Sequence, residues 1–289
     1  PEAYGNLADC EYLISRLDID PDIINHTPNV KFWQRWGAGF DHVDLKAWGE
    51  RGIPIATCPG VNSGIVAELA IMLMLAGYRN LLQINRQLRA GHWPRTEYFG
   101  RSFMIKGKTV GVLGLGHIGK KVAALATAFG ANVIYYDIVR QTEQEEQFGY
   151  RFVDFDTLLK ESDIFTIHCP LNEETRGLIG AAQFAQMKPT AMLINTARGP
   201  IVDEAALIDA LTTGKIATAG LDTYEHEPLP KDHPLLTLDN VVASAHAGGN
   251  TKDNDINMVN YVYHNIVAFD RGEPLNTPGD IVNGEYLKK

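Results

Sequence analysis

The feature of this sequence that most constrains its fold is the segment from Lys108 to Asp137, KTVGVLGLGHIGKKVAALATAFGANVIYYD. An apolar strand pattern from Thr109 to Leu115 runs into the turn GLGHIG, a helix pattern follows as far as Gly130, and a second strand pattern ends at Asp137. This order predicts the first βαβ part of a doubly wound sheet that binds a dinucleotide. The alternative is a structural glycine-rich turn in an unrelated α/β domain. The agreement of all these parts favours the dinucleotide site.

The glycine-rich turn has the residues that a dinucleotide requires. Gly114 allows a tight turn, Gly116 lets the backbone approach the pyrophosphate, and Gly119 lets the helix pack close to the strand. The helix N-terminus at His117 and Ile118 offers free N–H groups to the phosphate charge. We therefore expect these five residues to bind the cofactor.

Asp137 predicts which dinucleotide is bound. It lies 18 residues after Gly119 (137 − 119), where a carboxylate can accept hydrogen bonds from an adenosine ribose. The same charge would repel the 2′-phosphate of NADP, so the sequence favours NAD. Arg140 is the one nearby residue that would soften this preference, and we interpret it as an exposed loop arginine.

The composition excludes several classes of protein. The net charge of −9 over 289 residues argues against a nucleic-acid surface, which needs clustered Lys and Arg. Three cysteines without CxxC spacing fit a reducing cytoplasm. The longest apolar run, Leu69 to Gly77, is too short to cross a bilayer, so no contact with a membrane is expected. The nine histidines show no HxxH or HExxH spacing, so no metal is expected.

The rest of the chain predicts two α/β domains. Six strand patterns, the number in a doubly wound nucleotide-binding sheet, are Thr109 to Leu115, Asn132 to Asp137, Ile164 to Cys169, Ala191 to Ala197, Ala217 to Asp222 and Asn240 to Ala245. A smaller pattern upstream has strands at Cys10 to Ser15, Val30 to Trp36 and Ile53 to Ala56. We expect a dinucleotide-binding domain of residues 63–249 inserted into a smaller substrate domain of residues 1–62 and 250–289.

Helix patterns complete this organisation. A long one runs from about Gly64 to Arg89, with apolar residues at helical spacing. Its apolar surface exceeds what one domain face requires, so we expect a homodimer formed through it. Asp203 to Thr213 predicts a helix that Asp203 caps and Gly214 ends. Asp253 to Asp270 predicts another helix near the end of the sequence.

Three ionisable residues follow successive strand patterns. Arg198 follows the strand in NTARGPIVDE, Glu227 follows the strand ending at Asp222, and His246 follows the strand in SAHAGG. Ligands of open α/β sheets bind beyond the carboxyl ends of the strands, so a cation, an acid and an imidazole are predicted to meet beside the nicotinamide. Singly they read equally well as a surface ion pair, a loop carboxylate and a buried histidine.

Seven motifs resemble one family in order and spacing: WGAGFDHVD, PGVNSGIVAE, GLGHIG, HCPLNEETRGLI, NTARG, DTYEHEP and SAHAGG. The chain is similar to the D-isomer-specific 2-hydroxyacid dehydrogenases, which include phosphoglycerate, glycerate and D-lactate dehydrogenases. The resemblance implies a flavodoxin-like fold for the smaller domain. Family members usually begin with a further strand and helix before the segment that matches Asn6 to Ser15, so the substrate domain is expected to be incomplete as given.

The resemblance also implies roles for single residues. Arg198 would bind the carboxylate and keto oxygen of a 2-keto acid, His246 would be the general acid/base, and Glu227 would be its carboxylate partner. The N–H groups of Ala38 and Gly39 would hold the substrate carboxylate. Cofactor residues would be Asp222, which accepts a hydrogen bond from the nicotinamide carboxamide, and Thr196, Cys169 and Pro170, which line the groove.

Two other readings stay open. The related formate dehydrogenases use a glutamine where this chain has Glu227, and formate oxidation releases no hydroxyl proton, so that branch is disfavoured. NAD(H)-sensing corepressors share the fold and a similar triad, and they bind the cofactor with little turnover. The identity of the 2-hydroxy acid is not fixed by the sequence.

Overall fold

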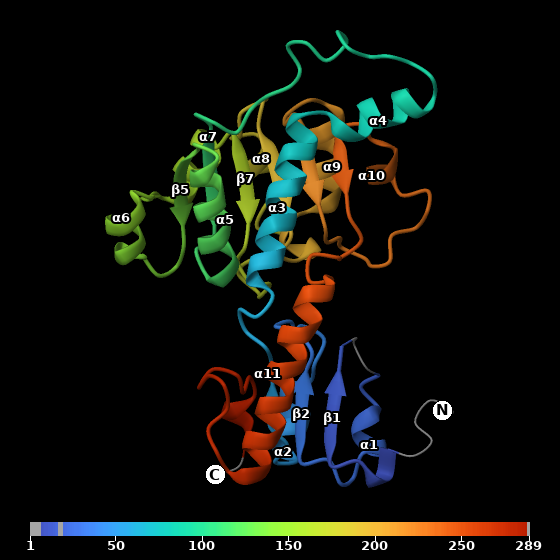
Figure 1. The fold of residues 1–289 in the computed structure, drawn as a ribbon, viewed down its shortest axis with the longest axis vertical. Coiled ribbons are helices and arrows are strands. Elements are labelled where there is room, and N and C mark those ends of the chain that lie inside the picture. The colour runs from blue at the N-terminus through green and yellow to red at the C-terminus, as the bar shows by residue number, and fades with distance from the viewer. Residues whose placement is uncertain (1–6, 17–19, 288–289) are drawn as a thin grey trace. The chain divides into compact units, whose positions relative to one another are not determined.

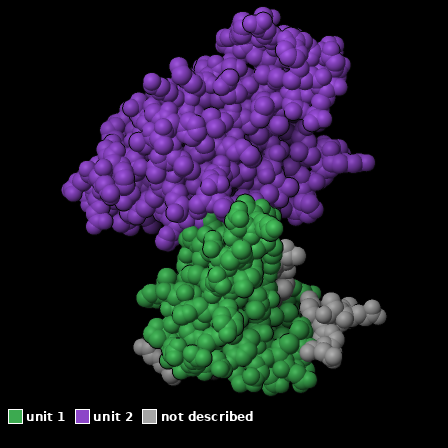
Figure 2. Space-filling view, in the orientation of Figure 1, with its two compact units in different colours: residues 1–62, 250–289 green, residues 63–249 purple. Residues whose placement is uncertain are grey.

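The structure, a computed structural model, describes residues 7–16 and 20–287. The chain divides into two compact units: residues 1–62 with 250–289, and residues 63–249 (Figure 2). Both ends of the chain thus belong to one unit. Each unit is described by itself below.

The larger unit contains a parallel sheet of seven strands. They are β4 (Thr109–Leu113), β5 (Asn132–Tyr136), β6 (Arg151–Phe152), β7 (Ile164–Ile167), β8 (Met192–Asn195), β9 (Thr218–Leu221) and β10 (Val241–Ala243). Their order is β10-β9-β8-β7-β4-β5-β6, which is the doubly wound order with one strand added at the β10 edge. The predicted Rossmann fold is confirmed. The six predicted strands all form, and the short β6 was not predicted.

Helices cover both faces of this sheet (Figure 1). The helices of this unit are α3 (Ser63–Tyr78), α4 (Leu81–Arg89), α5 (His117–Ala128), α6 (Thr142–Phe148), α7 (Phe155–Glu161), α8 (Ala181–Phe184), α9 (Glu204–Thr212) and α10 (Pro234–Thr237), of which α4 and α6 have no buried residue. Residues of α7, α8 and α9 pack with Leu113 and Phe165 on one face. Residues of α3 and α5 pack with Val112 and Ile164 on the other. Because successive strand residues face opposite helix layers, these strands are apolar throughout, as parallel strands are.

The single helix expected from Gly64 to Arg89 is two helices, so that prediction was wrong. Asn80 adopts a left-handed backbone with φ 51°, and α3 and α4 are bent by 63° at this break. Asn80 Nδ2 donates to the backbone of Arg101 and to Ser102 Oγ at 3.2 Å each, which fixes the bend. No single helix of the described residues is long and apolar enough to span a membrane, although α3 and α4 together pass that test by length and composition.

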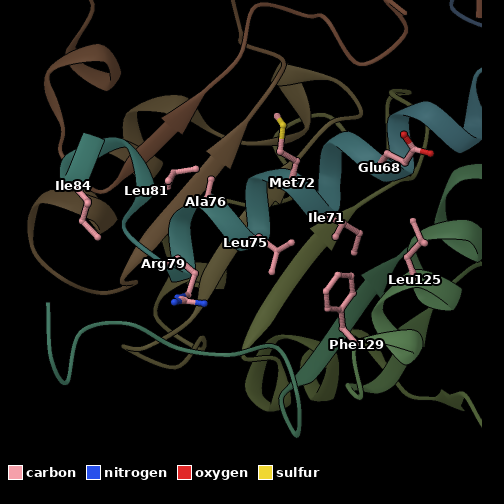
Figure 3. Close-up of a pocket in the computed structure, with 10 residues that line it drawn as sticks. All are labelled: Glu68, Ile71, Met72, Leu75, Ala76, Arg79, Leu81, Ile84, Leu125 and Phe129. Atoms are coloured by element: carbon pink, nitrogen blue, oxygen red, sulfur yellow. The ribbon is translucent and has the colours of Figure 1, made fainter. Parts of the chain in front are cut away.

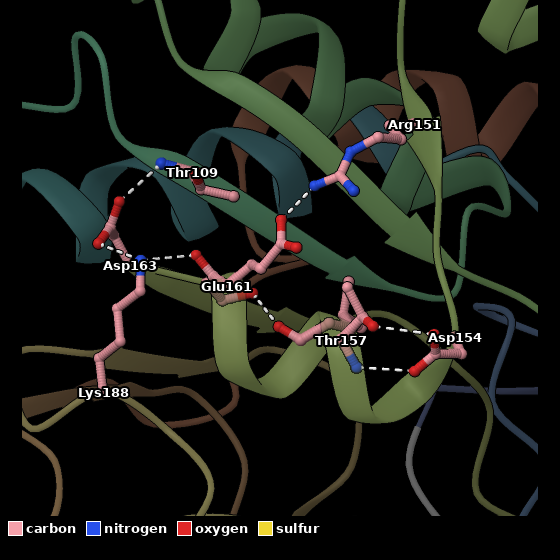
Figure 4. A network of polar contacts seen from close by, with 9 residues as sticks. Thr109, Arg151, Asp154, Thr157, Glu161, Asp163 and Lys188 are labelled. Carbon is pink, nitrogen blue, oxygen red and sulfur yellow. Dashed lines mark hydrogen bonds and ion pairs between the residues drawn. The ribbon is translucent and has the colours of Figure 1, made fainter.

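A polar network fastens the amino ends of the strands in this sheet (Figure 4). Asp163 Oδ2 accepts from Thr109 N at 2.8 Å, and its Oδ1 accepts from Lys188 Nζ at 2.8 Å. Asp154 caps α7 by accepting from Thr157 N at 2.8 Å. The Asp163 contacts lie at the amino ends of β4 and β7, opposite the candidate site, and stabilise the sheet, whereas Asp154 follows β6 and fixes only the start of α7.

The smaller unit contains β1 (Tyr12–Ser15), β2 (Phe32–Arg35) and β3 (Ile55–Ala56), which are parallel and adjacent in sequence order. Parallel strands that neighbour one another in sequence order are a feature of flavodoxin-like sheets, the fold that the resemblance implies for this unit. The helices of this unit are α1 (Ile23–His26), α2 (Leu45–Glu50) and α11 (Lys252–Arg271), with short 3-10 turns at Leu7–Asp9 and Gly284–Tyr286. Val282 N donates to Ile55 O at 2.9 Å, which ties the end of the chain to β3.

Candidate active site

The glycine-rich turn lies where the sheet reverses its order, between β4 and β7. Gly114 has φ 89°, and a Cβ there would lie 2.7 Å from Cys169 N, so the two loops touch. A Cβ on Gly119 would lie 2.1 Å from Gly114 O, whereas a Cβ on Gly116 would meet nothing within 4 Å. Gly114 and Gly119 are therefore required by the fold. Gly116 faces open space at the N-terminus of α5, which is where a pyrophosphate fits.

Asp137 lies directly after β5 and folds back on the glycine-rich turn. Its Oδ2 accepts from Leu115 N at 2.6 Å, and its Oδ1 accepts from Val139 N at 3.1 Å. Each carboxylate oxygen keeps a second acceptor position. The carboxylate is thus held in place and can still accept from a ribose.

Arg140 is engaged by a glutamate that the sequence analysis did not single out. Its Nε and Nη2 donate to the two oxygens of Glu145 at 2.8 and 2.7 Å. Tyr135 Oη also donates to Glu145 at 2.7 Å. Hydrogen bonds from Arg140 and then Tyr135 lower the pKa of Glu145 to about 2, so the glutamate stays charged. The arginine is therefore held in an ion pair beside the loop that follows Asp137.

The remaining predicted cofactor residues follow β7 and β8. Cys169 and Pro170 follow β7 after His168, and Thr196 directly follows β8. Among the described residues, the buried Thr196 Oγ1 has no hydrogen-bond partner, which fits a groove completed by a polar ligand. Burial raises the pKa of the Cys169 thiol to about 11, so this thiol stays protonated near neutral pH. Burial also lowers the pKa of His168 to about 3, so that imidazole is neutral.

His246 and Glu227 form a direct pair. His246 Nδ1 lies 2.7 Å from Glu227 Oε2, and Tyr224 N donates to Glu227 Oε1 at 2.9 Å. The carboxylate therefore fixes the proton on Nδ1 and leaves Nε2 as the exchanging nitrogen. Tyr224 Oη donates to Ser244 O at 2.6 Å, which links the loop after β9 to the loop after β10.

The contact between His246 and Glu227 changes the pKa of both residues. The pKa of His246 is raised by the hydrogen bond to Glu227, against burial and the charge of Arg198, which lower it. Burial raises the pKa of Glu227, but hydrogen bonds from His246 and Tyr224 N and the nearby charges outweigh it and lower the pKa overall. The site therefore favours imidazolium paired with carboxylate.

Asp222, buried at 2% exposure, organises the loop that bears His246. Its backbone oxygen accepts from His246 N at 2.8 Å. Its two carboxylate oxygens accept from Ala247 N and Gly248 N at 2.9 Å each. These bonds hold His246 at φ 50°, a left-handed conformation that is uncommon outside turns and functional sites.

Arg198 lies after β8, next to the loop of the acid–base pair. Its Nη1 donates to Ala197 O at 2.7 Å, and its backbone oxygen accepts from Asn195 Nδ2 at 2.9 Å. A Cβ on the next residue, Gly199, would lie 1.9 Å from the backbone carbon and oxygen of Tyr224. The backbones after β8 and β9 are thus in contact. The structure brings Arg198, Glu227 and His246 to the same edge of the sheet.

Ala38 and Gly39 lie in the smaller unit, in the loop after β2. Gly37 adopts φ 139°, and its oxygen accepts from Cys58 N at 2.8 Å. Arg35 Nε donates to Gly39 O at 3.3 Å. Within the described part of the chain, the N–H groups of Ala38 and Gly39 donate to no other group of the protein. The described residues also contain no cluster of three or more His, Cys, Asp or Glu side chains that would bind a metal.

Residues 71–248 match the model of the family "D-isomer specific 2-hydroxyacid dehydrogenase, NAD binding domain". The chain belongs to this family. The D-3-phosphoglycerate dehydrogenase of Archaeoglobus fulgidus is 43% identical over 261 residues, which cover 90% of this chain and 49% of that protein. The glyoxylate reductase of Korarchaeum cryptofilum is 38% identical over 284 residues, 97% of this chain and 85% of that protein. The chain thus spans about half the length of the first relative and most of the second.

The D-isomer specific 2-hydroxyacid dehydrogenase family also accounts for the fold. The structure of NAD-dependent formate dehydrogenase from Staphylococcus aureus in complex with NAD has a TM-score of 0.87 and 32% identity, and covers 97% of this chain and 85% of that one. Family, relatives and fold confirm the predicted family, the NAD cofactor and the class of NAD-dependent dehydrogenase.

Proposed function

We propose that this chain interconverts a 2-keto acid and a D-2-hydroxy acid, with His246 as general acid/base, Glu227 as its partner and Arg198 as the substrate-binding cation. The observation that carries the proposal is the 2.7 Å pair of His246 and Glu227, which lies at the same strand ends as Arg198 and the dinucleotide turn. A bound NAD would supply the hydride chemistry at C2 of the acid, and the residues of this chain would bind the acid and move the proton.

His246 supplies the proton that this chemistry needs. Hydride transfer to a keto carbon leaves charge on its oxygen, and a positioned imidazolium neutralises that charge by donating its Nε2 proton. In the oxidation direction, the neutral imidazole removes the hydroxyl proton. Glu227 stabilises the imidazolium and orients the ring. Formate oxidation has no such proton to transfer, so the pair favours hydroxy-acid chemistry.

Arg198 would bind the substrate and stabilise the developing charge. Its planar guanidinium can donate two parallel hydrogen bonds to a carboxylate. A guanidinium N–H of Arg198 near the keto oxygen would also stabilise the alkoxide-like transition state. From the smaller unit, we propose the N–H groups of Ala38 and Gly39 as donors to the substrate carboxylate.

The residues that would hold NAD follow from the geometry of the turn. Gly116 leaves room for the pyrophosphate, and the N–H groups of His117 and Ile118 lie at the start of α5. Asp137 would accept from the adenosine ribose. We propose that Asp222 accepts from the carboxamide through a remaining acceptor position, and that Thr196 lines the nicotinamide site.

A panel of 2-keto acids with NADH and with NADPH tests the proposal. Glyoxylate, hydroxypyruvate, pyruvate, branched keto acids and phosphohydroxypyruvate cover the chemistry, since the relatives are named as glyoxylate reductase and D-3-phosphoglycerate dehydrogenase. We expect turnover with at least one acid that is lost in His246→Ala. Tight NADH binding without turnover of any acid would instead favour an NAD(H)-sensing binding protein.

We further propose that the chain forms a homodimer through α3 and α4. A groove of about 760 Å³ runs along α3, α4 and α5 (Figure 3). It is lined mainly by apolar residues, including Ile71, Met72 and Phe129. No residue of α4 is buried, and Leu81 and Trp93 are 53% and 79% exposed. A second copy would cover both the groove and these exposed apolar side chains.

Sedimentation distinguishes the dimer from a monomer. Met72→Glu places a charge in the groove and is expected to yield monomers at micromolar concentration. Ile256→Glu makes the same type of change at an exposed residue of α11 and is the matched control. A wild-type protein that sediments as a monomer would contradict the proposed dimer.

A further inference from the structure

The acid–base pair depends on the conformation of one long loop. Glu227 lies within residues 222–233, which connect β9 to α10 without regular structure. When such a loop shifts, its carboxylate moves away from its hydrogen-bond partner. The 2.7 Å hydrogen bond to His246 Nδ1 would break after a small displacement of Glu227. Some other group must therefore hold the loop beyond Glu227 itself.

Glu204, the first residue of α9, makes two contacts with this loop. Its Oε2 accepts from Glu225 N at 3.2 Å, and its Oε1 lies 3.0 Å from His233 Nε2. The two contacted residues lie eight positions apart (233 − 225), on either side of Glu227. One carboxylate therefore fastens both ends of the segment that presents the catalytic glutamate.

The base of this contact is rigid. Asp203 caps α9 by accepting from Ala206 N at 2.9 Å, and Asp203 N donates to Ile179 O at 3.0 Å. Leu207 and Leu211 of the same helix are buried in the core. Glu204 thus projects from a fixed helix end, and its position does not depend on the loop.

We propose that Glu204 is a positioning residue for catalysis: its carboxylate clamps residues 225 and 233 and thereby holds Glu227 against His246. The inference rests on the proposed roles of Glu227 and His246. Glu204 touches neither of them, and it acts only through the loop backbone and His233.

Stability alone does not account for this arrangement. The side chains of His233 and Glu204 are only 16% and 15% exposed. Buried polar pairs are often replaced by apolar residues of similar volume without loss of stability. A hydrogen-bonded pair is favoured where a defined geometry is required, because hydrogen bonds have preferred directions. The clamp supplies such directions at the loop that bears Glu227.

Glu204→Ala, Glu204→Gln and His233→Ala test the proposal. Asp209→Asn is the matched control. It removes a carboxylate from the same helix, and that carboxylate only forms an exposed ion pair with Lys215. Three quantities are measured for each variant: kcat and KM for keto-acid reduction, the melting temperature, and the pKa of the His246 ring by NMR titration. The charged groups around that ring are Glu227, Arg198 and Asp222, and none of them is altered in these variants.

Misplacement of a catalytic group by about 1 Å can cost roughly 10²-fold in rate, so Glu204→Ala is expected to lower kcat 10- to 100-fold, roughly. The NADH affinity should be unchanged, and the pKa of His246 should fall toward its ordinary value. Glu204→Gln keeps an acceptor for Glu225 N and should therefore retain part of the wild-type kcat and part of the raised His246 pKa. His233→Ala should give an intermediate loss and tests the clamp if Glu204→Ala does not fold.

The NMR titration separates failure of this inference from failure of the proposed function. A Glu204→Ala protein that melts earlier but keeps the wild-type kcat and His246 pKa would overturn the clamp. If the wild type turned over no keto acid, the proposed function would fail. The response of the His246 pKa to Glu204 would still decide the positioning role.

Discussion

Replacing Glu227 by Gln tests the acid–base pair most directly. The change keeps the size of the side chain but removes the charge that partners His246 Nδ1 at 2.7 Å. Hydrogen bonds to charged groups contribute about 1.5–3 kcal/mol. Because the side chains of His246 and Glu227 are 51% and 34% exposed, solvent screening favours the lower end, about 1.5 kcal/mol. At about 1.4 kcal/mol per factor of ten, kcat/KM for keto-acid reduction near neutral pH should fall roughly tenfold.

The raised pKa of His246 determines the direction in which the pH profile of Glu227→Gln should move. Glu227 raises the pKa of His246 above its ordinary value of 6.5, so imidazolium persists to higher pH. Reduction needs imidazolium, and its rate therefore falls as the pH rises through the raised pKa. The same pair stabilises the folded state fully below the unfolded pKa of histidine, and this contribution is lost as the pH rises through the folded pKa. In Glu227→Gln the decrease in the rate of reduction and the loss of stability should both occur at lower pH.

The assay is the pH profile of NADH oxidation with the best keto acid from the panel. Glu225→Gln is the control, because it removes an exposed carboxylate from the same loop and should leave the profile unchanged. Superimposable profiles for wild type and Glu227→Gln would refute the reasoning, since Glu227 would then contribute nothing to the His246 titration.

Three further variants test the other parts of the site. Arg198→Lys keeps the charge but not the planar fork and should lower kcat/KM by about 10²–10³-fold, the typical loss of one oxyanion donor; kinetics with near wild-type values would contradict its role. Gly116→Ala should weaken NADH binding, measured by fluorescence, without lowering the melting temperature, because its Cβ meets no protein atom within 4 Å; Gly64→Ala, equally unobstructed, is the control. Glu145→Gln should release Arg140 and raise binding of 2′,5′-ADP relative to 5′-AMP, and an unchanged ratio would mean that the ion pair does not influence cofactor choice.

The sheet and its functional edge could be predicted because both follow from local pattern. Apolar strands alternating with helices predict parallel strands, and the carboxyl ends of parallel strands meet at one edge. Arg198 and His246 could therefore be assigned to that edge without coordinates. Strand ends were predicted one or two residues too long, as at Leu115, because β4 ends at Leu113 and Gly114 turns the chain at φ 89°.

The break between α3 and α4 could not be predicted from periodicity. Apolar residues such as Leu81 and Leu88 continue the helical spacing across the break, yet they are 53% and 43% exposed. The bend is set by Asn80, whose side chain bonds Arg101 and Ser102 more than 20 residues away. Such contacts leave no trace in a local pattern. Glu204 was overlooked for the same reason, although it stands in the quoted motif NTARGPIVDE.

The site geometry depends on coupling between two loops, and this changes how an Asp222 variant must be interpreted. Spacing places His246 19 residues after Glu227 (246 − 227), but the distance between them is set by other bonds. Tyr224 Oη holds Ser244 O, and Asp222 holds Ala247 N and Gly248 N. Loss of Asp222 would therefore displace His246 even if Asp222 never touched the cofactor. Lower turnover and a shifted His246 pKa in Asp222→Ala are expected under either role, because Asp222 also contributes to the raised pKa of His246. Weaker NADH binding is expected only if Asp222 contacts the carboxamide.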